Sequence, residues 1–206
     1  MSSERLVFTI GHSNHQIEAF ITLLKKYQVN CIVDVRSKPY SKLFPQFNKD
    51  NLSELLKKQR INYLSFAKEF GARYEKKAFL DENNHVDFVK VTVGDDFKMG
   101  LKRLKDGLNG NFRICLMCAE ADPFYCHRFV MIARPLQKEG FIVKHILKDG
   151  SLIDNIELEK ALVKKYQNQL PKETLFEKVS RSEQLEQAYR LRNKDIAFAP
   201  EKEMVI

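Results

Sequence analysis

Residues 114–128 read ICLMCAEADPFYCHR, and this stretch decides the fold. Its first four residues are apolar and predict a buried strand. Asp122 is a typical N-cap residue and Pro123 a typical first helical residue, so we expect a helix over about 124–139. Pro135 should kink that helix. The stretch therefore predicts a strand that turns into a helix, with reactive side chains at the junction, where open α/β sheets bind ligands and backbone N–H groups favour anions.

The same alternation of strand and helix patterns runs along the rest of the chain. Ser13, followed three residues later by Gln16, predicts a capping box for the first helix. Apolar runs predict four further strands, at residues 6–10, 31–35, 63–66 and 141–146. Strands that alternate with helices favour right-handed crossovers. The sequence therefore predicts a three-layer α/β fold with a mainly parallel five-stranded sheet and helices on both faces.

The chain changes character near residue 168. We expect an α/β core domain over residues 1–168 and a C-terminal helical extension over 169–206. Residues 172–206 are polar and hold seven Lys and Arg and seven Asp and Glu, so this part of the chain has no net charge. We expect the extension to lie on the core or on a neighbouring subunit, and a homodimer is compatible with the sequence.

Charge and cysteine content narrow the class of protein. The formal net charge is +8, and residues 36–77 hold eleven Lys and Arg against four Asp and Glu. The same segment carries seven aromatic residues, namely Tyr40, Phe44, Phe47, Tyr63, Phe66, Phe70 and Tyr74. No apolar run is long enough for a membrane span, and the N-terminus lacks a signal-peptide pattern. The four cysteines form no dense framework, so we expect a reduced, cytoplasmic protein without a membrane partner.

Polar groups follow three of the predicted strands at the point where each strand ends. They are Gly11-His12-Ser13, Asp34-Val35-Arg36 and Cys118-Ala119-Glu120. Because the carboxyl ends of parallel strands meet at one edge of a sheet, we expect these groups to share one crevice. Charges held so close to a core need partners, and the candidates for Asp34 are Arg36 and the backbone N–H groups of the following loop.

These positions supply the candidate site residues. The predicted catalytic residues are Cys118, Glu120, Asp34 and His12, and the predicted substrate-binding residues are Arg36, Ser41, Ser13, His127 and Arg128. A thiol beside a helix N-terminus and cationic groups is expected to have a lowered pKa and to act as a nucleophile. A carboxylate in the same loop suits acid–base chemistry.

Plainer interpretations of the same residues stay open. Cys118 also fits a buried structural thiol, and Glu120 also fits an ion pair with Arg128. Cys115 should point to the opposite face of its strand, into the core. We expect no cofactor and assign no metal, although Cys118, Cys126, His127 and His12 together could bind zinc. There is no dinucleotide fingerprint, Walker loop or nucleophile elbow.

Several motifs together resemble one known family. In order they are residues 9–13, Asp34-Val35-Arg36 with Pro39 and Ser41, Phe47-Asn48, residues 116–120, Cys126-His127-Arg128, His145-Ile146 and Asp149-Gly150. This pattern resembles domain-of-unknown-function family 488 over about residues 6–150. The resemblance implies a compact α/β domain of bacterial or archaeal type, and it implies no established activity.

The sequence thus favours a small enzyme that acts on an anionic substrate, such as a nucleotide or a nucleic acid. Arg36 and Arg128 would hold the anion, and the reaction type stays open. A non-catalytic nucleotide or nucleic-acid binding module is the alternative, because basic residues interleaved with aromatic ones suit such a partner. A zinc-dependent protein is a second alternative.

Overall fold

The computed structural model describes residues 5–173 and 178–200. Within these residues six strands form one sheet in the order β3-β2-β4-β1-β5-β6. The strands are β1 (Leu6–Gly11), β2 (Cys31–Asp34), β3 (Asn62–Ser65), β4 (Ile114–Cys118), β5 (Ile142–Ile146) and β6 (Leu152–Asp154). The first five run parallel, which confirms the predicted α/β class. The short sixth strand is an addition to the prediction, and it runs antiparallel to β5 after a turn at Gly150.

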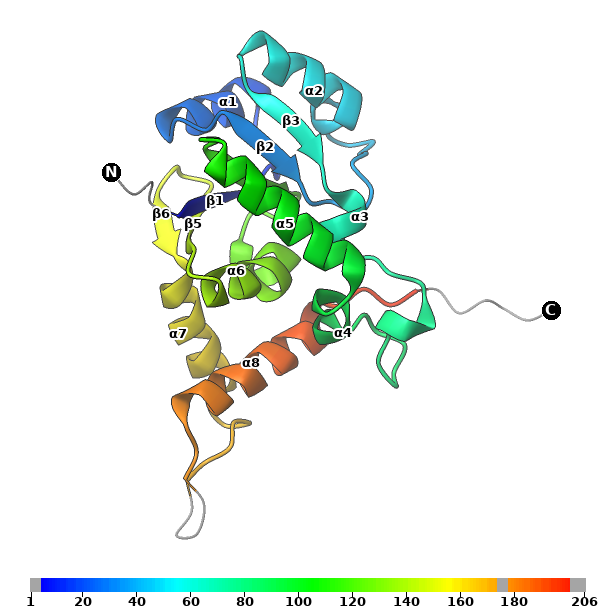
Figure 1. Ribbon diagram of the computed structural model, residues 1–206, viewed down its shortest axis with the longest axis vertical. Helices are drawn as coiled ribbons and strands as arrows, with labels where there is room; N and C mark the ends of the chain where they lie inside the picture. Colours follow the sequence, from blue (N-terminus) through cyan, green and yellow to red (C-terminus); the bar gives the residue numbers. More distant parts are fainter. Residues whose placement is uncertain (1–4, 174–177, 201–206) are drawn as a thin grey trace, which may run out of the picture.

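Helices cover both faces of the sheet (Figure 1). One face is covered by α1 (Ile17–Lys26), the 3-10 turn η1 (Pro45–Phe47) and α2 (Lys49–Lys58). The other face is covered by α3 (Ala67–Phe70), α4 (Phe88–Thr92), α5 (Asp95–Asn109), α6 (Arg134–Lys138), α7 (Asn155–Tyr166) and α8 (Arg181–Ile196). A further 3-10 turn, η2, spans Lys77–Phe79.

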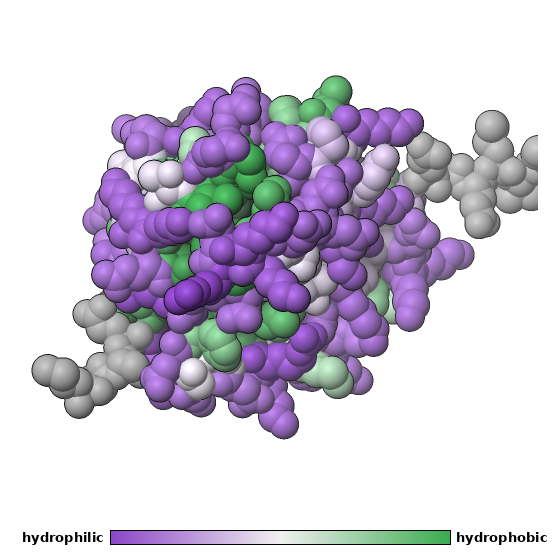
Figure 2. Space-filling model, turned by 90° about the horizontal axis from the view of Figure 1, so that it is seen from above, coloured by the Kyte–Doolittle hydropathy of each residue, from purple (hydrophilic) through white to green (hydrophobic). Residues whose placement is uncertain are grey.

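Successive side chains of β4 point to opposite faces of the sheet, as in any β-strand. Cys115 is buried in the cluster under α1 and α2, whereas Cys118 is buried in the cluster on the opposite face. The predicted opposition of these two thiols is therefore confirmed. Seen from above the view of Figure 1, the surface is mainly hydrophilic, with one larger hydrophobic patch near the middle and smaller ones elsewhere on the same face (Figure 2).

The segment after β4 differs from the predicted continuous helix over 124–139. Asp122 does accept a hydrogen bond from the Phe124 amide, but it caps only the 3-10 turn η3 (Pro123–Tyr125). A π-helix, η4 (Arg128–Ala133), then leads into α6. Pro135 has no N–H to donate and its ring crowds the preceding turn, which accounts for a widened helix immediately before it.

The predicted capping box of Ser13 and Gln16 is wrong. Helix α1 begins at Ile17, and its N-cap Gln16 makes no side-chain capping bond. The backbone amides of His12 and Ser13 instead donate to the carbonyls of Cys118 and Ala119, both at 2.8 Å. The chain after β1 therefore stays paired with the chain after β4, and the helix begins later than the sequence pattern predicts.

The C-terminal segment packs on the core rather than standing apart from it. Tyr189 and Ala188 of α8 are buried in the core cluster, and Arg134 forms an ion pair with Glu186. Ser180 and Glu183 form a complete capping box at the start of α8. In the described ranges 5–173 and 178–200, no helix has the length and apolar character needed to cross a membrane.

Candidate functional site

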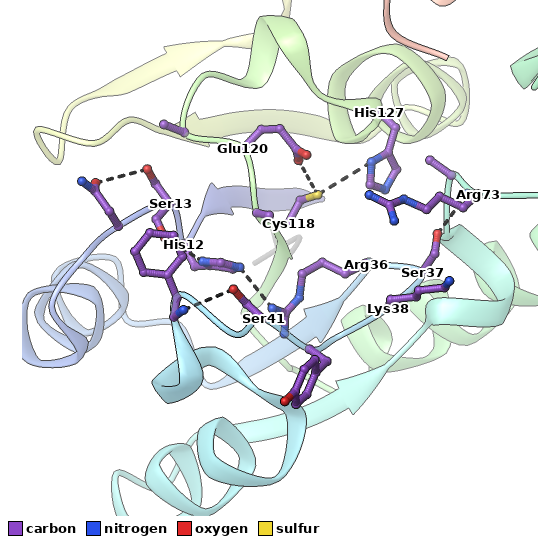
Figure 3. A pocket seen from close by; sticks show the side chains of 16 residues that line it. His12, Ser13, Arg36, Ser37, Lys38, Ser41, Arg73, Cys118, Glu120 and His127 are labelled. Carbon is purple, nitrogen blue, oxygen red and sulfur yellow. Dashed lines mark hydrogen bonds between the residues drawn. The ribbon is translucent and has the colours of Figure 1, made fainter. Parts of the chain in front are cut away.

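A cavity of about 630 Å³ lies where β1, β2 and β4 end. We call it the strand-end pocket (Figure 3). Seven of the predicted site residues line it: His12, Ser13, Arg36, Ser41, Cys118, Glu120 and His127. The shared crevice expected from parallel strand ends therefore exists. Asp34 and Arg128 are not among the lining residues, and both are fully buried.

Four side chains at the pocket wall converge on one point. The Cys118 thiol lies 2.8 Å from Glu120 Oε2, and the Cys126 thiol lies 3.1 Å from the same oxygen. His127 Nδ1 lies 3.7 Å from Cys118 Sγ and 3.8 Å from Cys126 Sγ. We call these four residues the Cys–His cluster. Both thiols are buried, and Glu120 extends from the loop after β4 toward Cys118 (Figure 3).

The imidazole of His127 is oriented by the backbone. Its Nε2 lies 3.1 Å from the carbonyl oxygen of Val35, which is an acceptor only. Nε2 therefore carries the proton and donates, which leaves the lone pair of Nδ1 directed at the two sulfur atoms. A neutral ring in this tautomer can accept a proton from a thiol or coordinate a cation.

Protonation within the Cys–His cluster differs from the sequence-based expectation. Burial raises the pKa of Cys118 well above its usual range, and the hydrogen bond to Cys126 raises it further. Burial also raises the pKa of Cys126, but the hydrogen bond from Cys118 and the charge of Arg128 hold it well below its ordinary value. The expectation of a lowered pKa at Cys118 is therefore wrong, because this thiol is buried and the neighbouring Cys126 and Glu120 oppose its ionisation.

Arg128 supports the loop after β4 instead of facing a ligand. Its guanidinium donates to the carbonyl of Glu120 at 2.6 Å and to the carbonyl of Ala121 at 2.9 Å. The alternative in which the Glu120 carboxylate pairs with Arg128 is therefore wrong, since that carboxylate contacts the two thiols. The close packing of this loop also explains Gly11, where an added Cβ would lie 1.8 Å from the Glu120 carbonyl oxygen.

Arg36 is likewise held by the protein. Its Nε and Nη2 donate to the Asp34 carboxylate, the shorter bond being 2.6 Å, and Nη2 also reaches the carbonyl of Phe47 at 2.8 Å. The Tyr63 hydroxyl donates to Asp34 at 2.6 Å. The predicted pairing of Asp34 with Arg36 is therefore present, and it neutralises most of the charge that Arg36 could offer to a ligand.

His12 occupies the same network. Its Nδ1 lies 2.9 Å from the Ser13 carbonyl, so Nδ1 donates and Nε2 accepts from Arg36 Nη1 at 3.1 Å. Burial lowers the pKa of His12 to about 4, although the bond to Ser13 opposes that shift. The ring stacks on Phe47 with centroids 4.4 Å apart. Both ring nitrogens are thus occupied, and the geometry suits a positioning role.

A comparison with protein-family models places the chain in a family. The model for a domain of unknown function, DUF488, matches residues 16–134, which is more than half of the chain. The protein belongs to the DUF488 family. The match confirms the resemblance drawn from the sequence motifs, although Gly11-His12-Ser13 and His145-Ile146 lie outside the matched residues. No curated protein and no solved structure matches the chain.

The rim of the pocket carries groups that the strand-end argument does not find. Lys38 and Arg73 are exposed lining residues, and the Arg73 amide donates to Ser37 Oγ at 3.0 Å. Arg73 extends toward His127 across the mouth of the pocket (Figure 3). Arg73 follows α3, which the pairing of β2 with β3 brings to this edge. In the sequence, only the basic character of segment 36–77 indicates that Arg73 could belong to a binding site.

The aromatic residues of segment 36–77 divide into core and rim. Phe47, Phe66 and Phe70 are fully buried. Tyr40, with 67% of its surface exposed, and the half-buried Phe44 line the pocket. Of the aromatic residues interleaved with basic ones in this segment, Tyr40 and Phe44 therefore lie at the mouth of the pocket, where a ligand could contact them.

Proposed function

We propose that this DUF488 protein is an enzyme that acts on a small phosphorylated ligand of mononucleotide size, bound in the strand-end pocket. The observation that carries the proposal is the joint presence of exposed cations and reactive groups in one cavity. Lys38 and Arg73 line one part of its wall, and Cys118 and Glu120 line another. Within the described part of the chain, no ion pair engages Lys38 or Arg73.

The size of the pocket favours a small ligand over a long polymer. Its volume of about 630 Å³ falls within the range of roughly 300–1,000 Å³ typical of small-molecule sites. Tyr40 and Phe44 offer aromatic faces near the cations. A nucleoside phosphate combines a base that stacks on such faces with a phosphate that pairs with Arg and Lys.

Glu120 is the reactive group most accessible to a bound ligand, because Cys118 and Cys126 are buried. Carboxylate-assisted hydrolysis and thiol chemistry at Cys118 both place the reacting bond in the same corner of the pocket. Removal of a positioned acid–base group typically lowers a rate by about 10²–10⁴-fold. Glu120→Gln should therefore abolish most turnover and leave ligand binding within about threefold of wild type.

Calorimetric titration with inorganic phosphate, AMP, ADP and ATP tests binding, and chromatography of the same mixtures tests conversion. Arg73→Ala should weaken nucleotide binding about tenfold, the equivalent of roughly 1.4 kcal/mol. Lys57→Ala is the matched control, since Lys57 is an exposed residue of α2 outside the pocket. Equal affinities for wild type, Arg73→Ala and Lys57→Ala would contradict the proposal.

A non-catalytic binding module is the second candidate. It is favoured by the observation that Arg36 and His12 are fully engaged with the protein. This candidate predicts that the nucleotides bind, that Arg73→Ala weakens binding, and that no product forms with any of them.

A further inference from the structure

We propose that Cys118, Cys126 and His127 bind one zinc ion, with Glu120 as a fourth ligand that can exchange. The site lies in the wall of the strand-end pocket, so the inference deepens the proposed function. It does not depend on the phosphorylated ligand, however, because the metal would bind in its absence. The potential ligand atoms of the four residues all lie within 4.8 Å of one another.

The separations suit a tetrahedral metal centre. Zn–S bonds of about 2.3 Å and Zn–N bonds of about 2.0–2.1 Å imply ligand-to-ligand separations of roughly 3.5–3.8 Å. His127 Nδ1 lies 3.7 and 3.8 Å from the two sulfur atoms. The Glu120 oxygen is closer, at 2.8 and 3.1 Å. Glu120 is an exposed loop residue. A small movement of its side chain away from the two sulfur atoms would therefore make room for the ion.

The backbone between the two cysteines makes the convergence possible. On a helix the side chains of adjacent residues such as Cys126 and His127 would point in different directions. Cys126 instead has extended backbone angles, φ −125° and ψ 144°, between the 3-10 turn η3 and the π-helix η4. The break in the helix thus lets both side chains face Cys118 at the end of β4.

The surroundings of His127 match those of a metal ligand. A coordinating histidine usually donates its second N–H to a carbonyl or carboxylate, which fixes the ring and its tautomer. His127 Nε2 makes this contact with the Val35 carbonyl, so Nδ1 is left to coordinate. Two thiolates and one imidazole form a ligand set that zinc prefers.

The buried charge of Arg128 gives a second, independent argument for a metal ion at this site. Arg128 is fully buried, its guanidinium contacts only backbone carbonyls, and its Nε has no hydrogen-bond partner within the described residues. A buried cation needs a nearby negative charge. Zn²⁺ with two thiolates and one carboxylate carries a net charge of −1, which Arg128 would balance.

Glu120 determines what such a centre can do. Three ligands are buried or nearly so, whereas Glu120 is exposed and lines the pocket. Exchange of its carboxylate for water would give a zinc-bound water that faces the ligand, with Glu120 adjacent as a proton acceptor. Three protein ligands with one exchangeable position are typical of catalytic zinc sites.

The test is the metal content of the purified protein, measured by mass spectrometry without any nucleotide. Wild type loaded with zinc and desalted should retain one ion per chain. Cys126→Ser and His127→Gln should retain less than a tenth of that amount. Cys115→Ser is the matched control, because this thiol is buried in the same strand on the opposite face, and it should retain a full equivalent.

Cobalt titration of the metal-free wild type gives a second readout that needs no variant. We expect thiolate-to-cobalt charge-transfer bands and the strong visible bands of tetrahedral cobalt, both removed by one equivalent of zinc. Wild type that retains no zinc and gives no such bands, or that is recovered with a Cys118–Cys126 disulfide, would overturn the inference. Those results would leave the nucleotide titrations free to support or contradict the proposed function separately.

Discussion

At the residue scale, two buried guanidinium groups show how side-chain partners depend on the fold. The sequence predicts that Arg36 and Arg128 hold an anionic ligand, but in the structure both are bound by the protein itself. Arg36 is bound by Asp34, whereas Arg128 is bound by two carbonyls of the loop after β4. The pairing of Arg36 with Asp34 could be predicted from their closeness in the sequence, but the carbonyl acceptors of Arg128 could not, because they belong to a loop whose course is set by tertiary packing.

Gly11 is predicted to be intolerant of any side chain. A Cβ at this position would lie 1.8 Å from the Glu120 carbonyl oxygen and 2.6 Å from its carbon, both in the backbone. Gly11→Ala should lower the free energy of unfolding by at least about 1–3 kcal/mol. Urea titration of the variant and of wild type measures this difference. Gly107→Ala is the control, since its Cβ would meet only the end of the Ile114 side chain at 3.1 Å. Equal stabilities of the two variants would contradict the close approach.

His145 is predicted to make the protein sensitive to acid. Burial lowers its pKa to about 4, against an ordinary value of 6.5. The folded state therefore binds this proton less readily than the unfolded state, so stability is present above about pH 6.5 and is lost as the pH falls toward 4. The neutral ring bridges Thr9 and Asn155, as expected of a satisfied core histidine.

The measurement is the urea midpoint of wild type and of His145→Gln between pH 7 and pH 4.5. The variant should be less stable at pH 7 but should lose less stability on acidification. His12, whose pKa burial also lowers to about 4, should leave part of the acid sensitivity in both proteins. Parallel curves for the two proteins would show that His145 is not responsible.

At the scale of elements, the segment after β4 departs most from its sequence pattern. Asp122 does act as an N-cap and Pro123 does begin a helical segment, but that segment is a single 3-10 turn. Periodicity could not reveal the π-helix that follows, because the apolar residues of Arg128–Ala133 are buried all round. The interruption matters for the site, since it places Cys126 and His127 beside Cys118.

Helix α8 is predicted to stabilise the whole core through Tyr189. This side chain is almost fully buried, its ring lies 5.4 Å from that of Phe129, and its hydroxyl donates to Glu159 at 3.0 Å. Tyr189→Ala should lower the free energy of unfolding by about 3–5 kcal/mol. Arg190→Ala, at the neighbouring exposed position, should change it by less than about 0.5 kcal/mol.

Thermal or urea unfolding of these two variants distinguishes an integral helix from a peripheral one. A small effect of Tyr189→Ala, similar to that of Arg190→Ala, would mean that α8 adds little to the core. A single cooperative transition in wild type is expected in either case for a chain whose C-terminal helix shares the core cluster.

At the scale of the whole molecule, the sequence predicts the sheet better than the pocket. Apolar runs such as 114–117 identify the parallel strands, whereas the three-residue β6 is too short to stand out. Strand ends locate His12, Arg36 and Cys118 at one edge. Arg73, whose amide donates to Ser37 Oγ, reaches the same pocket only through the pairing of β2 with β3, and that pairing is invisible in a local pattern.

The central claim is that the strand-end pocket is where this protein binds its ligand. The most direct measurement is a titration of isotope-labelled protein with AMP, followed in backbone amide spectra. We predict shifts confined to the residues that line the pocket, in 12–14, 36–41, 72–73 and 118–121. Shifts confined to the opposite edge of the sheet, near Asn30, Asn62 and Arg113, or no shifts at any residue, would contradict the account.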